Sequence, residues 1–115
     1  MNLITEWRFS PIKGYEDYII CDDGCAYSTK RKGKKLNLKP SKRKKYPRIR
    51  ICINGQESYL WVNRTVASHF IGDVIGKEVH HDDDDTWNNY WKNLIIMTKR
   101  ENLDIRNERN GYEKR

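Results

Sequence analysis

Polar and apolar residues alternate most regularly in the middle of the chain. Residues 46–53 read YPRIRICI, with an apolar residue at every second position, and residues 56–62 read QESYLWV. Between these runs stands Asn54-Gly55, the pair that best tolerates the positive φ angles of a type I′ turn. The pattern predicts a β-hairpin with one apolar face and one basic face. The apolar face would carry Ile49, Ile51 and Ile53, and the basic face Arg48 and Arg50.

Weaker strand signals precede this hairpin. Residues 17–21 (DYIIC) are rich in strand formers, and residues 25–29 resume a strand after the turn signal at residues 22–24. A second turn is predicted at residues 32–34 around Gly33. We expect residues 1–14, with Trp7, Pro11 and Gly14, to form an irregular segment.

The second half of the chain mixes helical and strand patterns. Asn63 is a candidate N-cap for a helix over residues 63–71, and a glycine-flanked linker follows at residues 72–76. Residues 78–82 and 93–97 predict two further strands. Thr98 and Glu101 have the spacing of a capping box, which predicts that a final helix begins there.

These elements predict an α+β fold. Residues 1–71 would form an N-terminal antiparallel β-sheet module with a short helix, and residues 72–108 a hairpin followed by a helix. Residues 109–115 would form a frayed, charged tail.

The charge of the chain is unevenly distributed. The formal net charge is +7, yet no acidic residue occurs between Asp23 and Glu57. Such a run of one sign repels itself unless a polyanion neutralises it, and nucleic acid is the commonest such partner. A solvated, disordered basic loop is the alternative interpretation. The candidate DNA contacts are Lys30, Arg31, Lys32, Lys34, Lys35, Lys42, Arg43, Lys44, Lys45, Arg48 and Arg50.

The cysteines and the hydropathy exclude other classes. Cys21, Cys25 and Cys52 are odd in number and follow no signal peptide, which argues against a disulfide framework. No apolar run approaches the roughly 18 residues of a membrane span. We therefore expect reduced thiols in a cytoplasmic protein without a membrane partner.

Residues 79–102 carry the pattern that bears chemistry, VHHDDDDTWNNYWKNLIIMTKREN. It resembles the HNH (ββα-metal) endonucleases, in particular those of the phage homing and free-standing type. Their sequences often read V-[ND]-H-x-D-G-N-x-x-N-N-x-x-x-N-L, followed by a threonine and Glu-Asn. The matching residues are Val79, His81, Asp83, Asn88, Asn89, Asn93, Leu94, Thr98, Glu101 and Asn102.

The resemblance extends towards the N-terminus. Trp7, the run Pro-Ile-Lys-Gly-Tyr-Glu-Asp-Tyr at residues 11–18 and the later run VNRTVASHF at residues 62–70 are similar to a NUMOD4-like module. Such modules precede the nuclease motif in many phage enzymes. The resemblance thus covers about residues 6 to 103 and implies a phage-encoded nuclease that nicks or cleaves double-stranded DNA.

The resemblance also implies roles for single residues. His81 would be the general base that takes a proton from water, and Asn93 would fix the hairpin loop and orient that base. His80 and Asn102 would be ligands of one divalent metal ion. Asp83 and Asn89 are candidates for supporting contacts behind these groups.

Two departures from the family pattern affect the expected metal preference and the expected turn after residue 83. His80 stands where the family often has Asp or Asn, and an imidazole ligand favours Mn, Ni, Co or Zn relative to Mg. We expect Mg or Mn as the cofactor, with Ni, Co or Zn also usable. Asp84 stands at the turn glycine, and Asp tolerates the left-handed region better than most residues.

The side chains around the motif have structural interpretations as well. Asp82, Asp84 and Asp85 could recruit a metal ion, but we favour a solvated acidic turn. His69 is expected to be structural, and Trp91 is expected in the core. Trp87 and Tyr90 could stack on bases or pack in the core.

Two other functions compete with the endonuclease. The first is a non-catalytic DNA-binding relic of the same fold. The second is a structural zinc domain that binds RNA or protein, which would need four closed ligands. A monomer and a homodimer are equally compatible with the sequence.

Overall fold

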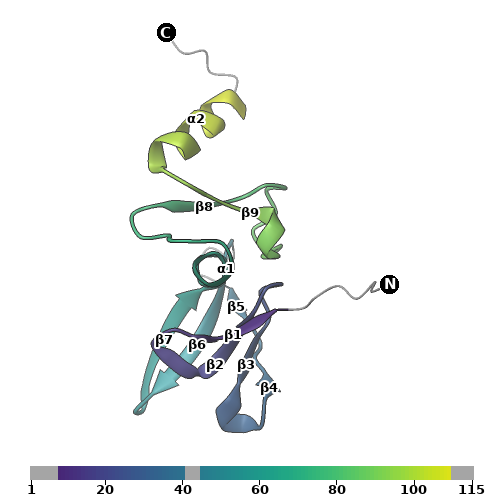
Figure 1. Cartoon of the computed structure of the whole chain (residues 1–115), viewed down its shortest axis with the longest axis vertical. Coiled ribbons are helices and arrows are strands. Elements are labelled where there is room, and N and C mark those ends of the chain that lie inside the picture. The colour runs from purple at the N-terminus through teal and green to yellow at the C-terminus, as the bar shows by residue number, and fades with distance from the viewer. Residues whose placement is uncertain (1–7, 41–44, 110–115) are drawn as a thin grey trace, which may run out of the picture.

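The structure is a computed structural model that describes residues 8–40 and 45–109 (Figure 1). A four-stranded sheet has the order β1-β2-β3-β4, a three-stranded sheet the order β5-β6-β7, and β8 pairs with β9 alone. The elements are β1 (Phe9–Ile12), β2 (Tyr15–Cys21), β3 (Ala26–Ser28), η1 (Thr29–Arg31), β4 (Lys34–Lys35), β5 (Lys39–Pro40), β6 (Pro47–Ile53), β7 (Gln56–Trp61), α1 (Val62–Phe70), β8 (Glu78–His81), η2 (Trp91–Asn93), β9 (Leu94–Met97) and α2 (Lys99–Arg109).

The N-terminal sheet corrects the prediction of an irregular segment over residues 1–14. β1 pairs antiparallel with β2, and Phe9 faces Cys21 in the register. Pro11 weakens the strand signal because proline cannot donate to a ladder, but β1 is an edge strand, where proline is tolerated. Residues 1–7 of that prediction lie outside the described residues.

The predicted central hairpin is confirmed. β6 and β7 pair antiparallel from Arg48↔Trp61 to Ile53↔Gln56. Asn54 and Gly55 join them with φ angles of 51° and 78°, as a type I′ turn requires. Ile49 and Ile51 are buried on one face of β6, while Arg48 and Arg50 lie on the other.

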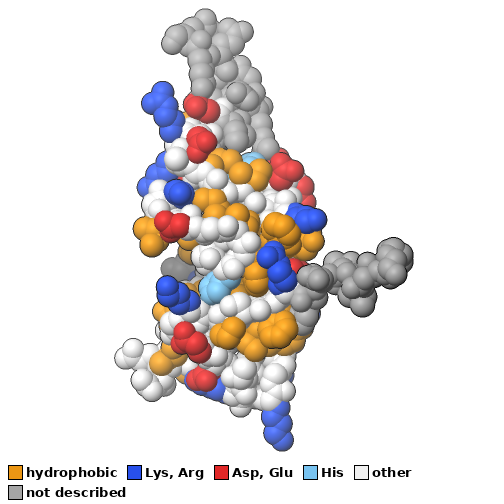
Figure 2. Space-filling view, viewed as in Figure 1, with side chains coloured by type: hydrophobic (Ala, Val, Ile, Leu, Met, Phe, Trp, Pro, Cys, Tyr) orange, Lys and Arg blue, Asp and Glu red, His pale blue; other side chains and the backbone are white. Residues whose placement is uncertain are grey.

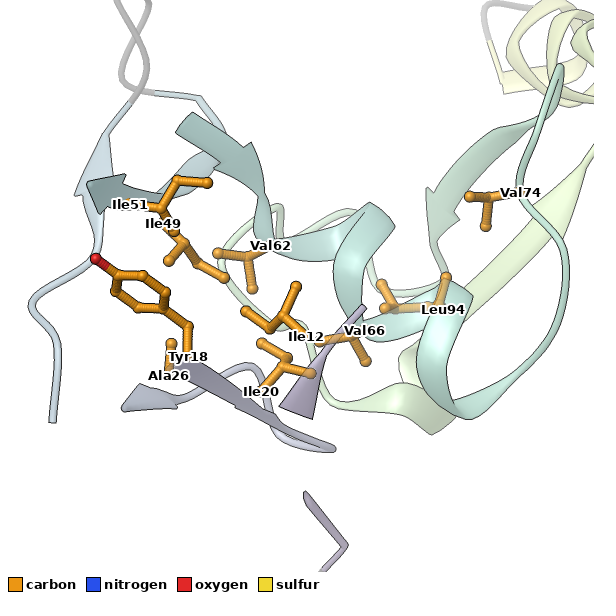
Figure 3. Packing of buried hydrophobic residues seen from close by; sticks show 11 residues of the cluster. Ile12, Tyr18, Ile20, Ala26, Ile49, Ile51, Val62, Val66, Val74 and Leu94 are labelled. Atoms are coloured by element: carbon orange, nitrogen blue, oxygen red, sulfur yellow. The ribbon is translucent and has the colours of Figure 1, made fainter. Parts of the chain in front are cut away.

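Helix α1 connects the sheets to the C-terminal hairpin (Figure 1). It begins at Val62 with Trp61 at the N-cap, so the prediction of Asn63 as N-cap was wrong. Val62 and Val66 are fully buried, and burial of this apolar face moves the N-cap two residues earlier than predicted. Figure 3 shows both valines among isoleucines of the two sheets, and the same buried cluster includes Leu94 of β9.

The segment between α1 and β8 was predicted as a linker and is held against the helix. Val74 belongs to the buried cluster. The Arg64 guanidinium donates hydrogen bonds to the carbonyls of Val74 and Lys77, each at 2.7 Å. Helix α1 therefore fixes the chain immediately before β8.

The C-terminal elements agree closely with the predicted ones. β8 pairs with β9 from Glu78↔Met97 to His81↔Leu94. The capping box of α2 is confirmed, because the Glu101 carboxylate accepts from the Thr98 N–H at 2.8 Å and Thr98 Oγ1 accepts from the Glu101 N–H at 3.1 Å. The helix continues to Arg109, and residues 110–115 lie outside the described residues.

The cysteines are free thiols, as predicted. Burial and the nearby Asp23 carboxylate raise the pKa of Cys21 to about 12. In the described part of the chain, no helix has the length and apolar character needed to span a membrane.

Candidate active site

A hollow of about 680 Å³ lies beside β8, between the start of α1 and the first turn of α2. We call it the β8–α2 hollow. It gathers the two adjacent histidines and the helical asparagine that the sequence singled out. Its wall consists of Lys45, Tyr46, Trp61, Asn63, Arg64, Glu78, Val79, His80, His81, Asp84, Thr86 and Asn102.

His81 is held in a buried position at the end of β8. Its Nε2 lies 2.8 Å from Asn89 Oδ1, and the Asn89 amide nitrogen in turn donates to the Thr86 carbonyl at 3.2 Å. Because the Asn89 oxygen can only accept, His81 Nε2 carries the proton and donates. The Nδ1 lone pair of a neutral His81 is then the one that can take a proton.

Asn89 is nearly fully buried, at 2% exposed. Its contact with His81 gives a definite geometry to a residue for which the sequence suggested only a supporting position. The close approach of Gly24 to the Asn89 side chain contributes to this burial, because a Cβ at Gly24 would lie 2.9 Å from Asn89 Cβ. The N-terminal sheet thus helps to fix the partner of the histidine.

Asn93 organises the loop that joins β8 to β9. Its amide nitrogen donates to Asp83 Oδ1 at 2.9 Å and to the Asn88 carbonyl at 2.8 Å, and its Oδ1 accepts from the Asp83 N–H. Hydrogen bonds from Asn88 and Asn93 hold the pKa of the Asp83 carboxyl below its usual value. Asn93 therefore holds the loop together, and it is not one of the residues that line the β8–α2 hollow.

The loop also contains the substituted turn position. Asp84 adopts a φ of 63°, the left-handed conformation that the sequence analysis expected it to tolerate. Thr86 Oγ1 donates to the carbonyl of Lys45, which ties the loop to the basic run, the stretch between Asp23 and Glu57 that has no acidic residue.

Asn102 reaches the hollow from the first turns of α2. Its amide nitrogen donates to Glu78 Oε1 at the start of β8. Glu78 was not among the predicted site residues. The signal for it was its position two residues before His80, since residues i and i+2 of a strand share a face.

The donor set fits a divalent cation with few protein ligands. His80 offers a ring nitrogen, Asn102 an amide oxygen and Glu78 a carboxylate, all on the wall of the β8–α2 hollow. Among the side chains that the structure describes, no three from His, Cys, Asp or Glu form a group that could hold a metal. A closed zinc site is therefore absent from this part of the chain, and water and phosphate oxygens would complete the coordination.

The predicted DNA contacts differ in exposure and in their contacts within the protein. Lys45 lies on the wall of the hollow, and Lys32, Lys34 and Lys35 are exposed. On the face drawn in Figure 2, basic side chains are scattered among acidic and apolar ones. Lys42, Arg43, Lys44 and the side chain of Arg31 lie outside the described residues.

Among the described DNA-contact candidates, several have protein partners, and Lys35 is one of them because its side chain hydrogen-bonds with Cys25. Lys30 donates to the Cys52 carbonyl at 3.0 Å. Arg48 lies over the Tyr59 ring, 4.2 Å from its centroid. Arg50 Nη2 lies 2.5 Å from a carboxylate oxygen of Glu57, and this contact raises the pKa of Arg50 further. The sequence could not show these contacts because each crosses between strands or segments.

Trp91 and His69 have contacts within the protein, whereas Trp87 is exposed. Trp91 packs against the buried cluster, as expected, and Trp87 is 46% exposed. His69 Nε2 accepts from the Lys13 N–H at 3.0 Å, and its Nδ1 lies 2.8 Å from the Thr65 carbonyl. These contacts agree with a structural role for His69.

Comparison with known proteins agrees with this geometry. Residues 60–103 match the family model described as HNH endonuclease. A solved structure described as DNA binding and cleavage by the HNH homing endonuclease I-HmuI aligns with a TM-score of 0.80 and 34% sequence identity. The alignment covers 96% of this chain and 62% of that one, so this chain spans about three-fifths of its neighbour. No curated protein matches the chain significantly. The predicted α+β fold is confirmed, and it is similar to that of the HNH homing endonuclease I-HmuI.

Proposed function

We propose that this protein is a metal-dependent HNH endonuclease that nicks or cleaves duplex DNA by hydrolysing a phosphodiester bond. In this proposal residues 1–71 hold the DNA and residues 72–108 form the nuclease motif. The observation that carries it is the shared hollow: His80, His81 and Asn102, from a strand and a helix, line one cavity. The similarity to I-HmuI also supports an enzyme of the homing type, and the resemblance of residues 79–102 to phage enzymes is the ground for proposing a phage origin.

In this mechanism His81 is the general base. Its Nε2–H stays bonded to Asn89 Oδ1, so Nδ1 accepts the proton as water attacks the phosphorus. The Asn89 oxygen then stabilises the imidazolium that forms, in the manner of a residue that orients a catalytic histidine. Asn93 is a positioning residue, because it fixes the loop from which Asn89 projects.

The cation site would lie on the same wall. His80 and Asn102 would hold a divalent cation through a ring nitrogen and an amide oxygen. When bound, the cation would stabilise negative charge on the phosphate and on the leaving oxygen. Because imidazole is one of these ligands, activity should extend to Mn, Co, Ni or Zn.

DNA binding would use the basic run next to this site. Lys45 lies on the wall of the hollow, and its carbonyl accepts from Thr86 of the active-site loop. A DNA backbone bound along the basic run would therefore have a phosphate close to His81. Such contacts give an affinity that falls as salt rises.

The direct test compares wild type with His81→Ala. Wild type should nick supercoiled plasmid with Mn²⁺, and His81→Ala should lose about 10²–10⁴-fold in rate. Both proteins should bind duplex DNA equally in a gel-shift assay. Wild-type protein that binds DNA but cuts in no divalent metal would instead support the non-catalytic relic.

A metal series tests the ligand assignment. Plasmid nicking should proceed with Mn²⁺ and with at least one of Co²⁺, Ni²⁺ and Zn²⁺ as well as Mg²⁺. Strict dependence on Mg²⁺ would contradict an imidazole ligand at position 80.

A further inference from the structure

We propose that Glu78 is the charged member of the cation site and orients Asn102 within it; this inference rests on the proposed function. Glu78 and His80 occupy positions i and i+2 of β8, so their side chains leave the same face of the strand. Both line the β8–α2 hollow together with Asn102. Asn102 donates to Glu78 through its amide nitrogen.

His80 and Asn102 alone leave the cation site without a negative charge. A neutral imidazole and a carboxamide bring no negative charge to a divalent cation. Hard cations bind best to oxygen ligands that include carboxylates. The Glu78 carboxylate supplies that charge on the same strand face as His80, where the neutral pair lacks it.

Glu78 also fixes the orientation of the Asn102 amide. A carboxamide has one donor end and one acceptor end. Glu78 Oε1 accepts from the donor end, which fixes the amide and leaves Asn102 Oδ1 for a cation. A partner behind a metal ligand typically changes metal affinity or activity about 10–100-fold when it is removed.

Mn²⁺ binding followed by electron paramagnetic resonance tests this inference without relying on cleavage. The full chain carries His81→Ala, so that a bound DNA duplex stays intact. Adding Glu78→Gln, which keeps the hydrogen-bond acceptor but removes the charge, should weaken Mn²⁺ binding about ten-fold. Thermal unfolding in the absence of metal should stay unchanged, because Gln has the same shape.

The matched control removes a second carboxylate from the same hollow. Asp84 lies on its wall in the turn after β8, and Asp84→Asn keeps a residue that tolerates the left-handed conformation. We expect this variant to change Mn²⁺ affinity less than about two-fold, since solvent screens charges beyond the ligands. Equal losses in both variants would show a general charge effect and overturn the specific role of Glu78.

A rescue variant separates charge from fold. His80→Asp in the Glu78→Gln background returns one carboxylate to the same strand face and should restore most of the lost Mn²⁺ affinity. Failure of this rescue would contradict the charge argument. Replacing Glu78 by Ala, which removes both charge and acceptor, should weaken binding further than Gln does.

The outcomes distinguish this inference from the proposed function. If wild type cuts DNA with Mn²⁺ and Glu78→Gln binds Mn²⁺ as tightly as its parent, Glu78 has no such role and the endonuclease stands. If wild type neither cuts DNA nor binds Mn²⁺ in the presence of DNA, the endonuclease itself is refuted and this inference with it.

Discussion

The sheets around α1 are packed by apolar side chains, whereas the loop between β8 and β9 is held by hydrogen bonds between polar side chains. Ile20, Ile49 and Val66 are almost fully buried in the first region. In the second, Asn93 bonds to Asp83 and to the Asn88 carbonyl. Apolar burial has little directional preference, but hydrogen bonds fix the orientation of both partners.

The two regions therefore contribute differently, one to the free energy of folding and the other to the orientation of His81. The apolar region supplies most of the free energy of folding, because it buries the most apolar surface. The polar loop supplies the orientation of His81, which chemistry needs and packing alone does not give. Helix α1 joins the two, since it contacts the strands of both regions.

The largest expected effect comes from the apolar region. Ile51→Ala should lower the free energy of unfolding by about 2–5 kcal/mol, because it removes a fully buried side chain and leaves a cavity. Urea denaturation measures this loss. DNA cleavage per folded molecule should stay near that of wild type. A loss of cleavage without a loss of stability would contradict the assignment of stability to the apolar region.

A substitution among the polar contacts of His81 should lower the rate of cleavage and leave DNA binding intact. Asn89→Ala removes the acceptor that holds His81 Nε2–H, so cleavage should fall about 10–100-fold. Gel-shift affinity for DNA should not change. Ser68→Ala, on the exposed side of α1, is the control and should leave cleavage unaltered. Full activity of Asn89→Ala would show that His81 needs no such partner.

The start of α2 should show a smaller effect. Thr98→Ala removes the cap and should cost about 1 kcal/mol, seen as faster hydrogen exchange in α2. The backbone N–H of Thr98 lowers the pKa of Glu101. A lowered folded pKa stabilises at neutral pH, and that contribution is lost as the pH falls below the usual Glu value of about 4.3. Protection factors in α2, which are corrected for the intrinsic pH dependence of amide exchange, should fall on acidification below that value, and unchanged protection factors would contradict a stabilising role of the Glu101 carboxylate.

The smallest effect is expected on the basic face of β6. Glu57→Gln releases Arg50 from its ion pair, so DNA affinity at low salt should rise a few-fold. The gain should vanish at high salt, where charges are screened. A loss of affinity would mean that the paired arginine is the one that contacts DNA.

Local patterns predicted most of the secondary structure. The Asn54-Gly55 turn and the capping box at Thr98 depend on neighbours in sequence, and both were predicted correctly. The start of α1 was misplaced because burial of Val62, a tertiary effect, decides it over the capping preference of Asn63.

The site was predicted as a set of residues but not as a set of contacts. The motif spacing selected His81 and Asn102, which the fold brings to one hollow. The bond from Asn102 to Glu78 spans 24 positions, and the ion pair of Arg50 with Glu57 crosses a hairpin. Such contacts depend on register and packing, which no local pattern contains.

In the proposed enzyme, β8 and the first turns of α2 surround a cation next to His81. Paramagnetic broadening by Mn²⁺ in an amide nuclear magnetic resonance spectrum of the full chain tests this placement. We expect the amides of residues 78–81 and 101–103 to broaden first, at the lowest Mn²⁺ concentration. Broadening confined to the acidic turn at residues 82–85, with β8 and α2 unaffected, would contradict it.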